Sequence, residues 1–260
     1  MEKYGFSKQE NANQKEMFEN QGDGASELFK GEGKSLATHE LYAESADLFA
    51  GIIKKYLQPE EKCTLTDVGS YQGEFLGDVL NKLPEYTFST VAIEMNENAL
   101  AHNNADNKIV AGAEKLPIKD ASADIVLCRY VLQWNDTEKQ KEIIKEIARS
   151  VNKIAIIQHA GADDINPDEW RSRMTDVFDG EEIPQLKRGG MFFSSAQELE
   201  QWMIDDGIKF ERVQERVIQN LSDVFIEKYN LPENEAKVMK NILGDKDHIH
   251  QVTWVIFPAE

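Results

Sequence analysis

The sequence predicts an α/β fold: a doubly wound, mainly parallel sheet of seven strands with a helical cap at its N-terminal end. Apolar strands and amphipathic helices alternate five times along the chain, and two more strands follow near its end. Such alternation indicates βαβ units whose helices cover both faces of one sheet. The 260 residues, 41% of them hydrophobic, are enough for the core of a single domain of this kind.

The first strand and its two flanking helices open the domain. Residues 36–57 carry apolar side chains at helical spacing as far as Pro59. A buried strand is expected at 63–69, where it ends in a glycine turn, and a helix follows at 73–83 before Pro84. Proline is expected to end both helices because it cannot continue the hydrogen-bond ladder.

Three more strands are expected at 90–94, 109–110 and 124–128. Asn96 is a suitable N-cap for the helix that follows the first of them. The strand at 124–128 is apolar at almost every position, as expected when helices cover both faces of a parallel sheet.

The last part of the chain continues the pattern less regularly. A helix after Asp136 leads to a fifth strand at 153–157. Two more helices are indicated by the proline and acidic residues after Asn166 and by the capping box that begins at Ser195. A helical stretch is then bracketed by two late strands, expected at about 208–218 and 250–257.

The charge of the chain excludes several classes of function. It carries 47 acidic against 29 basic residues, a net charge of −18. A protein that follows nucleic-acid phosphates needs a basic face, and the sequence contains no Lys/Arg run that would supply one. No apolar run approaches the ~20 residues that span a bilayer, and no signal-peptide pattern is visible. We therefore expect a soluble cytoplasmic protein that binds neither nucleic acid nor membrane.

Neither a disulfide nor a metal site is expected. Cys63 and Cys128 fall near opposite ends of neighbouring strands, too far apart for a bridge, and are interpreted as small buried hydrophobes. His248 and His250 share one face of a late strand, but no third ligand stands at a helpful spacing.

Two features lie at the carboxyl ends of strands, where open α/β sheets bind their ligands. The turn Asp67-Val-Gly69-Ser-Tyr71-Gln-Gly73 allows backbone to approach a ligand at a helix N-terminus, although a tight packing turn would look the same. A dinucleotide fingerprint is excluded, because Tyr71 and Glu74 stand where it needs glycine. Glu94, which closes the second strand, suits the two hydroxyls of a ribose, or is simply a solvated acid.

Two further stretches complete the pattern. They are Ala111-Gly112-Ala113-Glu114-Lys-Leu116-Pro117-Ile118-Lys-Asp120-Ala-Ser122-Ala-Asp124 and Leu132-Gln133-Trp134. With these, residues 63–160 resemble the class I S-adenosylmethionine-dependent methyltransferases, in particular the group that acts on small molecules. The resemblance implies a Rossmann-like methyltransferase fold, S-adenosyl-L-methionine as cofactor, and in-line methyl transfer to an oxygen, nitrogen or carbon atom of a small metabolite or natural-product intermediate.

The resemblance also implies a role for each matched residue. Along the methionine part of the cofactor it places Asp67, Gly69, Ser70, Tyr71 and Gly73, with the backbone at Cys128 and Arg129 facing the methionine amino group. On the ribose and adenine it places Glu94, Met95, Gly112, Ala113 and Glu114.

Two positions depart from the family pattern. Tyr71 replaces the middle glycine of the first turn, which implies either a negative φ or a side chain that closes over the site. Gly112 replaces the aspartate that reads the adenine, so that hydrogen bond has to come from elsewhere or from backbone.

The acceptor side is expected to use less familiar parts of the chain. Methyl transfer needs a base only if the acceptor must lose a proton, and His159, expected just after the fifth strand, is the candidate; a passive histidine bound to backbone is the alternative. Trp134, Trp170 and Phe192 are candidates for the walls of the acceptor pocket, or are packing residues.

We divide the single domain into three parts: residues 1–60 as a lid and helical cap, 61–160 as the cofactor-binding core, and 161–260 as a substrate-side insertion with the late strands. Two alternatives stay open, a catalytically silent methyltransferase-like protein that binds another chain and a nicotinamide-dependent oxidoreductase. The patterns do not specify the acceptor, the methylated atom or the oligomeric state.

Overall fold

The computed structural model describes residues 36–59, 62–161, 166–178, 180–184, 192 and 194–259. The segment up to residue 35 lies outside this part of the chain, so the expected lid stays a prediction.

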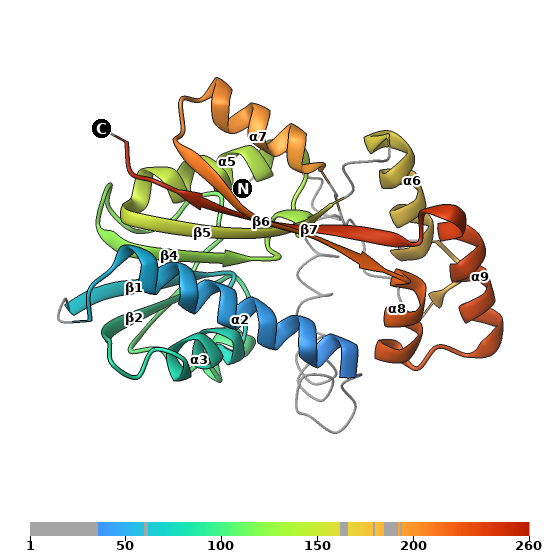
Figure 1. Ribbon diagram of the computed structural model, residues 1–260, viewed down its shortest axis with the longest axis horizontal. Helices are drawn as coiled ribbons and strands as arrows, with labels where there is room; N and C mark the ends of the chain where they lie inside the picture. Colours follow the sequence, from blue (N-terminus) through green and yellow to red (C-terminus); the bar gives the residue numbers. More distant parts are fainter. Residues whose placement is uncertain are drawn as a thin grey trace.

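A seven-stranded sheet forms the middle layer of the molecule (Figure 1). Its strands are β1 (Lys62–Val68), β2 (Thr87–Glu94), β3 (Asn107–Val110), β4 (Ala123–Arg129), β5 (Val151–Gly161), β6 (Phe210–Gln219) and β7 (His248–Ile256). They lie in the order β3-β2-β1-β4-β5-β7-β6. Strands β1 to β5 are parallel, and β7 is antiparallel to both of its neighbours. The predicted fold class is confirmed.

Helices cover both faces of this sheet (Figure 1). The helices of the first five βα repeats are α2 (Leu36–Tyr56), α3 (Glu74–Asn81), α4 (Glu97–Ala101), the 3-10 helix η1 (Leu132–Trp134), and α5 (Thr137–Ser150), with α7 (Ala196–Asp205) added later. Helices α5 and α7 bury apolar side chains such as Ile143 and Leu199 against one face. Helices α2 and α3 do the same against the other face with Phe49 and Val79.

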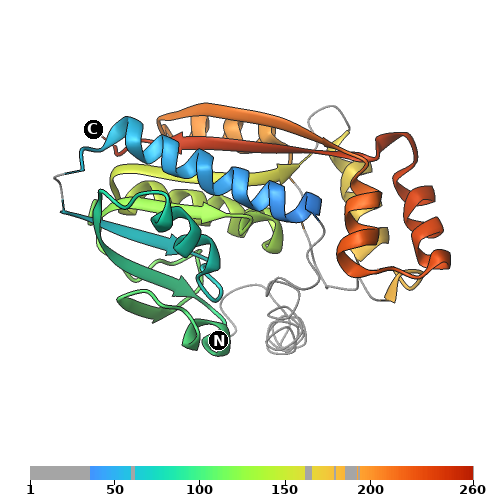
Figure 2. The same ribbon diagram turned by 60° about the horizontal axis from the view of Figure 1, so that its bottom comes forward.

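A separate lobe lies beyond one end of β5, β6 and β7 (Figure 2). This C-terminal lobe consists of α6 (Pro167–Phe178), α8 (Leu221–Tyr229) and α9 (Glu233–Leu243), followed by the 3-10 helix η3 (Gly244–Lys246). It has its own apolar cluster around Trp170 and Met239 and joins the sheet through Ala160 and Ile249. The helical stretch predicted here is two helices, because Asn230 takes a left-handed conformation (φ 47°) between them.

The predicted helix starts agree with the structure. The side chains of Asn96, Asp136 and Ser195 each accept a hydrogen bond from a backbone amide in the first turn of the helix that they cap, and Ser195 forms the full capping box with Glu198. Each cap satisfies an amide that would otherwise lack a partner, so the three caps fix where their helices begin.

The fifth strand is longer than predicted. It covers residues 151–161 where the sequence indicates 153–157, because β7 pairs with it as far as Gly161. His159 therefore lies inside the strand and not after it, which corrects its predicted position. The second strand likewise begins earlier, at Thr87.

Cys63 and Cys128 are both buried and neither forms a disulfide. In the described residues, no helix has the length and apolar character that crossing a membrane requires.

Candidate functional site

The sheet reverses its strand order between β1 and β4, which are hydrogen-bonded neighbours. From β1 the chain moves outward through β2 to β3, and it then returns to start β4 on the other side. In sheets with such a reversal the loops that leave the two strands turn in opposite directions, and ligands usually bind at the carboxyl ends of these strands.

The turn after β1 has a backbone that only glycine adopts without strain. Gly69 and Gly73 have φ values of 70° and 86°. A methyl group added at Gly69 would lie 2.3 Å from Cγ2 of Val131, and one at Gly73 would lie 2.7 Å from the Asn103 side chain. Both glycines are therefore required by close approach as well as by φ.

Tyr71 lies between these glycines and also has a positive φ, 48°. Of the two alternatives that the sequence left for Tyr71, the negative φ is thus wrong, and a side chain that closes over the site stays a prediction. A left-handed tyrosine costs about 1–3 kcal/mol unless its surroundings hold it, and such residues gather at ligand sites. Here the amide of Tyr71 donates to Oε2 of Glu94 at 3.0 Å, which fixes the turn against the end of β2.

Glu94 joins three segments at the carboxyl edge of the sheet. It is 8% exposed, and its Oε1 accepts a second hydrogen bond, from the amide of Asn96 at 2.9 Å. The backbone continues the contact: Gly69 donates to the carbonyl of Ile93 at 2.8 Å, and Ala111 donates to that of Glu94 at 3.2 Å. A carboxylate offers about four acceptor positions, so two remain for a ligand diol.

The segment after β3 brings a second carboxylate to the same edge. Glu114 folds back over Gly112, and a methyl group added at Gly112 would lie 2.3 Å from Oε2 of Glu114. Gly112 stands where the family pattern has an aspartate. Because glycine has no side chain, the carboxylate of Glu114 has room at this position. Met95 and Val110, which are 51% and 54% exposed, are large apolar side chains beside this segment. They are suited to cover a flat apolar ring.

Asp67 at the end of β1 is buried (4% exposed), and its pKa is raised to about 7. Burial is the main cause, the charge of Glu94 adds to it, and Arg129 opposes it. Burial also raises the pKa of the neighbouring Cys128 thiol, which keeps it protonated. A buried carboxyl that titrates near neutral pH marks this edge as a place for a positively charged ligand group.

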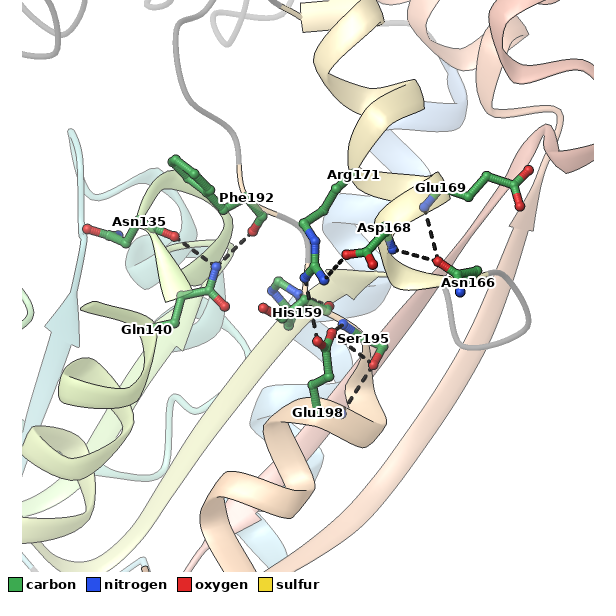
Figure 3. Close-up of polar contacts among 11 residues, drawn as sticks. Asn135, Gln140, His159, Asn166, Asp168, Glu169, Arg171, Phe192, Ser195 and Glu198 are labelled. Carbon is green, nitrogen blue, oxygen red and sulfur yellow. Dashed lines mark hydrogen bonds and ion pairs between the residues drawn. The ribbon is translucent and has the colours of Figure 1, made fainter. Parts of the chain in front are cut away.

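His159 lies near the carboxyl end of β5, close to the start of α7 (Figure 3). One ring nitrogen, Nε2, lies 2.9 Å from the carbonyl oxygen of Ser194. A carbonyl only accepts, so Nε2 carries the proton and Nδ1 carries the lone pair. Burial lowers the pKa of His159 to about 4, so the ring is neutral at pH 7. Nδ1 is buried and has no hydrogen-bond partner among the described residues.

Phe192 is held against η1 and α5 (Figure 3). The Phe192 amide donates to the carbonyl of Gln133 at 2.7 Å, and Nε2 of Gln140 donates to the carbonyls of Phe192 and Asn135, both at 2.8 Å. Phe192 and Trp134 are partly exposed at this edge. Trp170, in contrast, is 1% exposed and packs in the C-terminal lobe, which is the packing role that the sequence left open.

Sequence reasoning missed residues that hold the site without belonging to a motif. Asn103 is 1% exposed and donates to Ser70 Oγ at 3.2 Å and to the carbonyl of Tyr71 at 3.3 Å. Tyr130, just after β4, has a φ of 56°. A tyrosine directly after an apolar strand that ends in arginine gave no signal of that conformation.

In the described residues, no three His, Cys, Asp or Glu side chains gather as a metal ligand set. His250 instead contacts Glu215, with Nδ1 and Oε1 2.9 Å apart.

A doubly wound sheet of this order, with a glycine turn after β1 and an acid at the end of β2, defines a nucleoside-binding α/β enzyme. Residues 66–157 match the family model described as a methyltransferase domain. These residues run from β1 to β5 and lie within the stretch that resembles the class I S-adenosylmethionine-dependent methyltransferases, whose cofactor is S-adenosylmethionine. The match favours a methyltransferase over the nicotinamide-dependent oxidoreductase.

Solved structures share the fold at low sequence identity. The YcgJ protein from Bacillus subtilis has a TM-score of 0.62 and 14% identity, over 84% of this chain and 99% of that one. The geranyl diphosphate C-methyltransferase from Streptomyces coelicolor, solved with Mg²⁺, geranyl diphosphate and S-adenosylhomocysteine, has a TM-score of 0.58 and 12% identity, over 85% and 81%. The [4+2]-cyclase SpnF has a TM-score of 0.57 and 14% identity, over 84% and 83%. No curated protein matches the chain in sequence.

Proposed function

We propose that the enzyme transfers the methyl group of S-adenosylmethionine to an oxygen, nitrogen or carbon atom of a small molecule by in-line displacement. The observation that carries the proposal is the meeting of three segments at one edge of the sheet. Tyr71 and Ala111 both donate to Glu94, so the turn after β1, the end of β2 and the start of the 111–114 segment form one hydrogen-bonded unit.

The cofactor supplies a methyl group on a positively charged sulfur, so the protein mainly has to position the acceptor about 3–3.5 Å away. We assign the ribose hydroxyls to Glu94 and the positively charged methionine end to Asp67. The turn residues Gly69, Ser70, Tyr71 and Gly73 and the backbone at Cys128 and Arg129 line the methionine end, and Met95, Gly112, Ala113 and Glu114 surround the adenine. The two carboxyls give this edge the negative charge that a cationic cofactor requires.

A small acceptor is supported by the fold relatives and by the charge of the chain. The geranyl diphosphate C-methyltransferase shares the fold and has a small-molecule substrate in its site. The net charge of −18 disfavours a nucleic-acid acceptor. We place the acceptor near Trp134, in η1, and Phe192, shortly before α7, two aromatic residues that are partly exposed.

His159 is assigned a positioning role toward the segment that contains Ser194. Its proton is committed to the Ser194 carbonyl, and its lowered pKa makes it a weak base. An acceptor that is already nucleophilic, such as a neutral amine, needs no base. For an acceptor that must ionise, the lone pair on Nδ1 is the group that would take the proton.

We place the activity in the cytoplasm. The support is the pair of buried cysteines that form no disulfide, Cys63 and Cys128, since thiols stay reduced in that compartment.

The test is calorimetric titration of S-adenosylmethionine and S-adenosylhomocysteine into the wild type and Glu94→Ala. We expect saturable binding to the wild type and a loss of affinity of at least ~100-fold in the variant, since each hydrogen bond to a charged group contributes about 1.5–3 kcal/mol. Glu97→Ala, which removes an exposed acid three residues along the chain, is the matched control and keeps full affinity.

Turnover is then measured with labelled cofactor and fractionated metabolites, with mass analysis for the gain of one methylene group. A folded wild type that binds neither nucleoside would overturn the proposal. Binding without turnover of any fraction would favour the silent methyltransferase-like protein.

A further inference from the structure

Four buried polar atoms around the segment at 192–195 have no hydrogen-bond partner among the described residues. They are Oε1 of Gln133, Oε1 of Gln140, Nδ1 of His159 and Oγ of Ser194, and we call their side chains the polar cluster. Each of these side chains is 6% exposed or less. A buried polar atom without a partner destabilises a fold, because it has lost its hydrogen bonds to water. Four such atoms in one place therefore need a common explanation.

One short stretch of chain joins the members of the polar cluster (Figure 3). At Phe192, the carbonyl of Gln133 accepts from the backbone amide, and Nε2 of Gln140 donates to the backbone carbonyl. His159 contacts the carbonyl of Ser194, two residues further along. Two residues span at most about 7 Å of chain, so these contacts lie close together.

The polar cluster lies on one face of the sheet. His159 follows Ala155 and Ile157 at alternate positions of β5, and both of these pack in the apolar cluster that α5 and α7 cover. Alternate side chains of a strand point to the same face, so His159 also points toward these helices. Gln140 is a buried residue near the start of α5. The apolar core on this face therefore ends in polar side chains near the carboxyl edge of the sheet.

The free atoms of the polar cluster are mainly hydrogen-bond acceptors. Both N–H groups of the Gln140 side chain are used, one on the carbonyl of Phe192 and one on that of Asn135, which leaves its oxygen. The ring proton of His159 is used on the Ser194 carbonyl, which leaves the lone pair of Nδ1. Of the four atoms, the Ser194 hydroxyl alone can also donate. The matching ligand group is therefore one that donates, an N–H or an O–H.

The charges beside the polar cluster disfavour an anion. Glu198 accepts from the amide of Ser195, which directly follows Ser194, at 2.8 Å. Arg171 contacts both Glu198, at 3.5 Å, and Asp168, at 2.9 Å, so two carboxylates compensate its positive charge. A carboxylate or phosphate would meet lone pairs and these negative charges.

We propose that the methyl acceptor is an amine or an alcohol whose N–H or O–H group donates to the polar cluster, and that carboxylates and phosphates are rejected. The inference rests on the proposed function and names the chemistry of its acceptor. That chemistry differs from the geranyl diphosphate bound to the C-methyltransferase that shares the fold. Trp134 and Phe192, each within two residues of a member of the cluster, are partly exposed, so the acceptor passes them to reach the buried atoms.

The first arm of the experiment is thermal unfolding of the wild type with saturating S-adenosylhomocysteine. Benzyl alcohol, benzylamine, benzyl methyl ether or sodium benzoate is then added. The four compounds share a ring that can pack on Trp134 and Phe192, and they differ in the polar group. We expect the alcohol, the amine or both to raise the unfolding midpoint by about 2 °C or more, and the ether and benzoate to leave it unchanged. The alcohol and the amine show which donor is preferred.

The second arm uses Ser194→Ala, which removes an atom of the polar cluster but no hydrogen bond between described residues. The variant should unfold at the wild-type midpoint or above it and bind S-adenosylhomocysteine normally. Its affinity for the stabilising benzyl compound should fall about 2–10-fold, as for the loss of one hydrogen bond. A purely structural hydroxyl would not give this combination.

Ser222→Ala is the matched control. Ser222 is also 1% exposed, but its hydroxyl donates to Oδ2 of Asp247 in the C-terminal lobe. This variant should lose about 2–6 °C in midpoint and bind the benzyl compound as the wild type does.

Three outcomes would overturn the inference while S-adenosylhomocysteine still binds. They are stabilisation by benzoate equal to that by the alcohol and the amine, no stabilisation by any of the four compounds, and a Ser194→Ala variant that loses stability like Ser222→Ala and keeps its affinity for the benzyl compound. If the folded wild type does not bind S-adenosylhomocysteine, the proposed function fails and this inference fails with it.

Discussion

The carboxyl edge of the sheet has one part that we assign to the cofactor, the cofactor end, and one that we assign to the acceptor, the acceptor end. Different kinds of contact hold these two parts together. At the cofactor end, backbone amides of a tight turn donate to one carboxylate, that of Glu94, and to the carbonyl beside it. At the acceptor end, side chains do this work: Gln140 and His159 each hold a backbone carbonyl of the segment at 192–194. Hydrogen bonds from backbone amides therefore fix the cofactor end, and hydrogen bonds from side chains fix the acceptor end.

The difference concerns how far apart in sequence the partners lie. The hydrogen bond between Tyr71 and Glu94 spans 23 residues within one βαβ unit. The contacts of His159 with Ser194 and of Gln140 with Phe192 span 35 and 52 residues, across the whole insertion after β5. The part of the site that we assign to the cofactor is therefore specified within a short stretch of sequence, and the part that we assign to the acceptor depends on contacts between distant residues.

The largest effect on this comparison is expected from Gly69→Ala. Gly69 and Gly207 both have φ near 70°, but a methyl group at Gly69 would lie 2.3 Å from Cγ2 of Val131, whereas nothing lies within 4 Å of one at Gly207. We expect Gly207→Ala to lower the free energy of unfolding by about 1 kcal/mol from φ alone, and Gly69→Ala by about 3–5 kcal/mol from φ and overlap together.

Denaturant unfolding measures both values, and Val131→Ala combined with Gly69→Ala provides the check. Removing the two methyl groups of Val131 relieves the overlap, so the double variant should recover part of the loss. Equal effects of the two glycine substitutions would show that close packing does not hold the cofactor end together.

Asp67→Asn tests the charge of the cofactor end. In the folded chain the pKa of Asp67 is about 7, against 3.8 for an ordinary aspartate, so between these pH values the folded state keeps a proton that the unfolded state has lost. The contribution of this carboxyl to stability is therefore complete below pH 3.8 and is lost as the pH rises through 7. We expect Asp67→Asn to be more stable than the wild type by about 2–4 kcal/mol at pH 8 and not at pH 4.

The measurement is thermal unfolding at a series of pH values, paired with titrations of S-adenosylhomocysteine at pH 8. The variant should gain stability and lose affinity, because the ionised carboxyl is unfavourable in the empty fold and favourable beside a cation. A variant that is less stable than the wild type at pH 8 would contradict the raised pKa.

Features of the fold that depend on neighbouring residues could be predicted from the sequence, and features that depend on distant partners could not. The alternation of strands and helices, the caps at Asn96 and Ser195 and the acid at the end of β2 are encoded by local patterns, which is why they could be recognised. The length of β5 could not, because β7, almost a hundred residues later, extends it to Gly161. Local pattern contains no information on such a partner.

Within the site, the residues that could not be predicted from the sequence are those that hold other residues in position. Asn103 braces the turn from the end of α4, and Tyr130 holds Arg129 through a backbone conformation that tyrosine rarely adopts. Tyr71 is the same case: its side chain predicts a negative φ, and the hydrogen bond to Glu94 overrides that preference. Tertiary contacts of this kind decide conformations that residue type alone predicts wrongly.

His159→Gln gives the smallest effect and tests the acceptor end. Burial lowers the pKa of His159 to about 4 against 6.5, so the unfolded chain binds a proton there that the folded chain does not. The contribution of His159 to stability is complete above pH 6.5 and is lost as the pH falls toward 4, opposite in sign to Asp67. Glutamine keeps an N–H donor for the Ser194 carbonyl and does not titrate, so the stability advantage of the wild type over the variant should shrink by about 1–3 kcal/mol between pH 7 and pH 4.

Unfolding curves at matched pH values measure that difference, and the pH profile of kcat/KM separates positioning from base catalysis. If His159 only holds the segment at 192–195, the variant keeps the shape of the wild-type profile and loses a constant factor. If Nδ1 takes a proton from the acceptor, the wild type shows an acidic limb that the variant lacks, because the group that titrates is gone. That second outcome would mean that a residue of the acceptor end takes part in the reaction. The acceptor end would then differ from the cofactor end in how it is held together, but not in having a purely structural role.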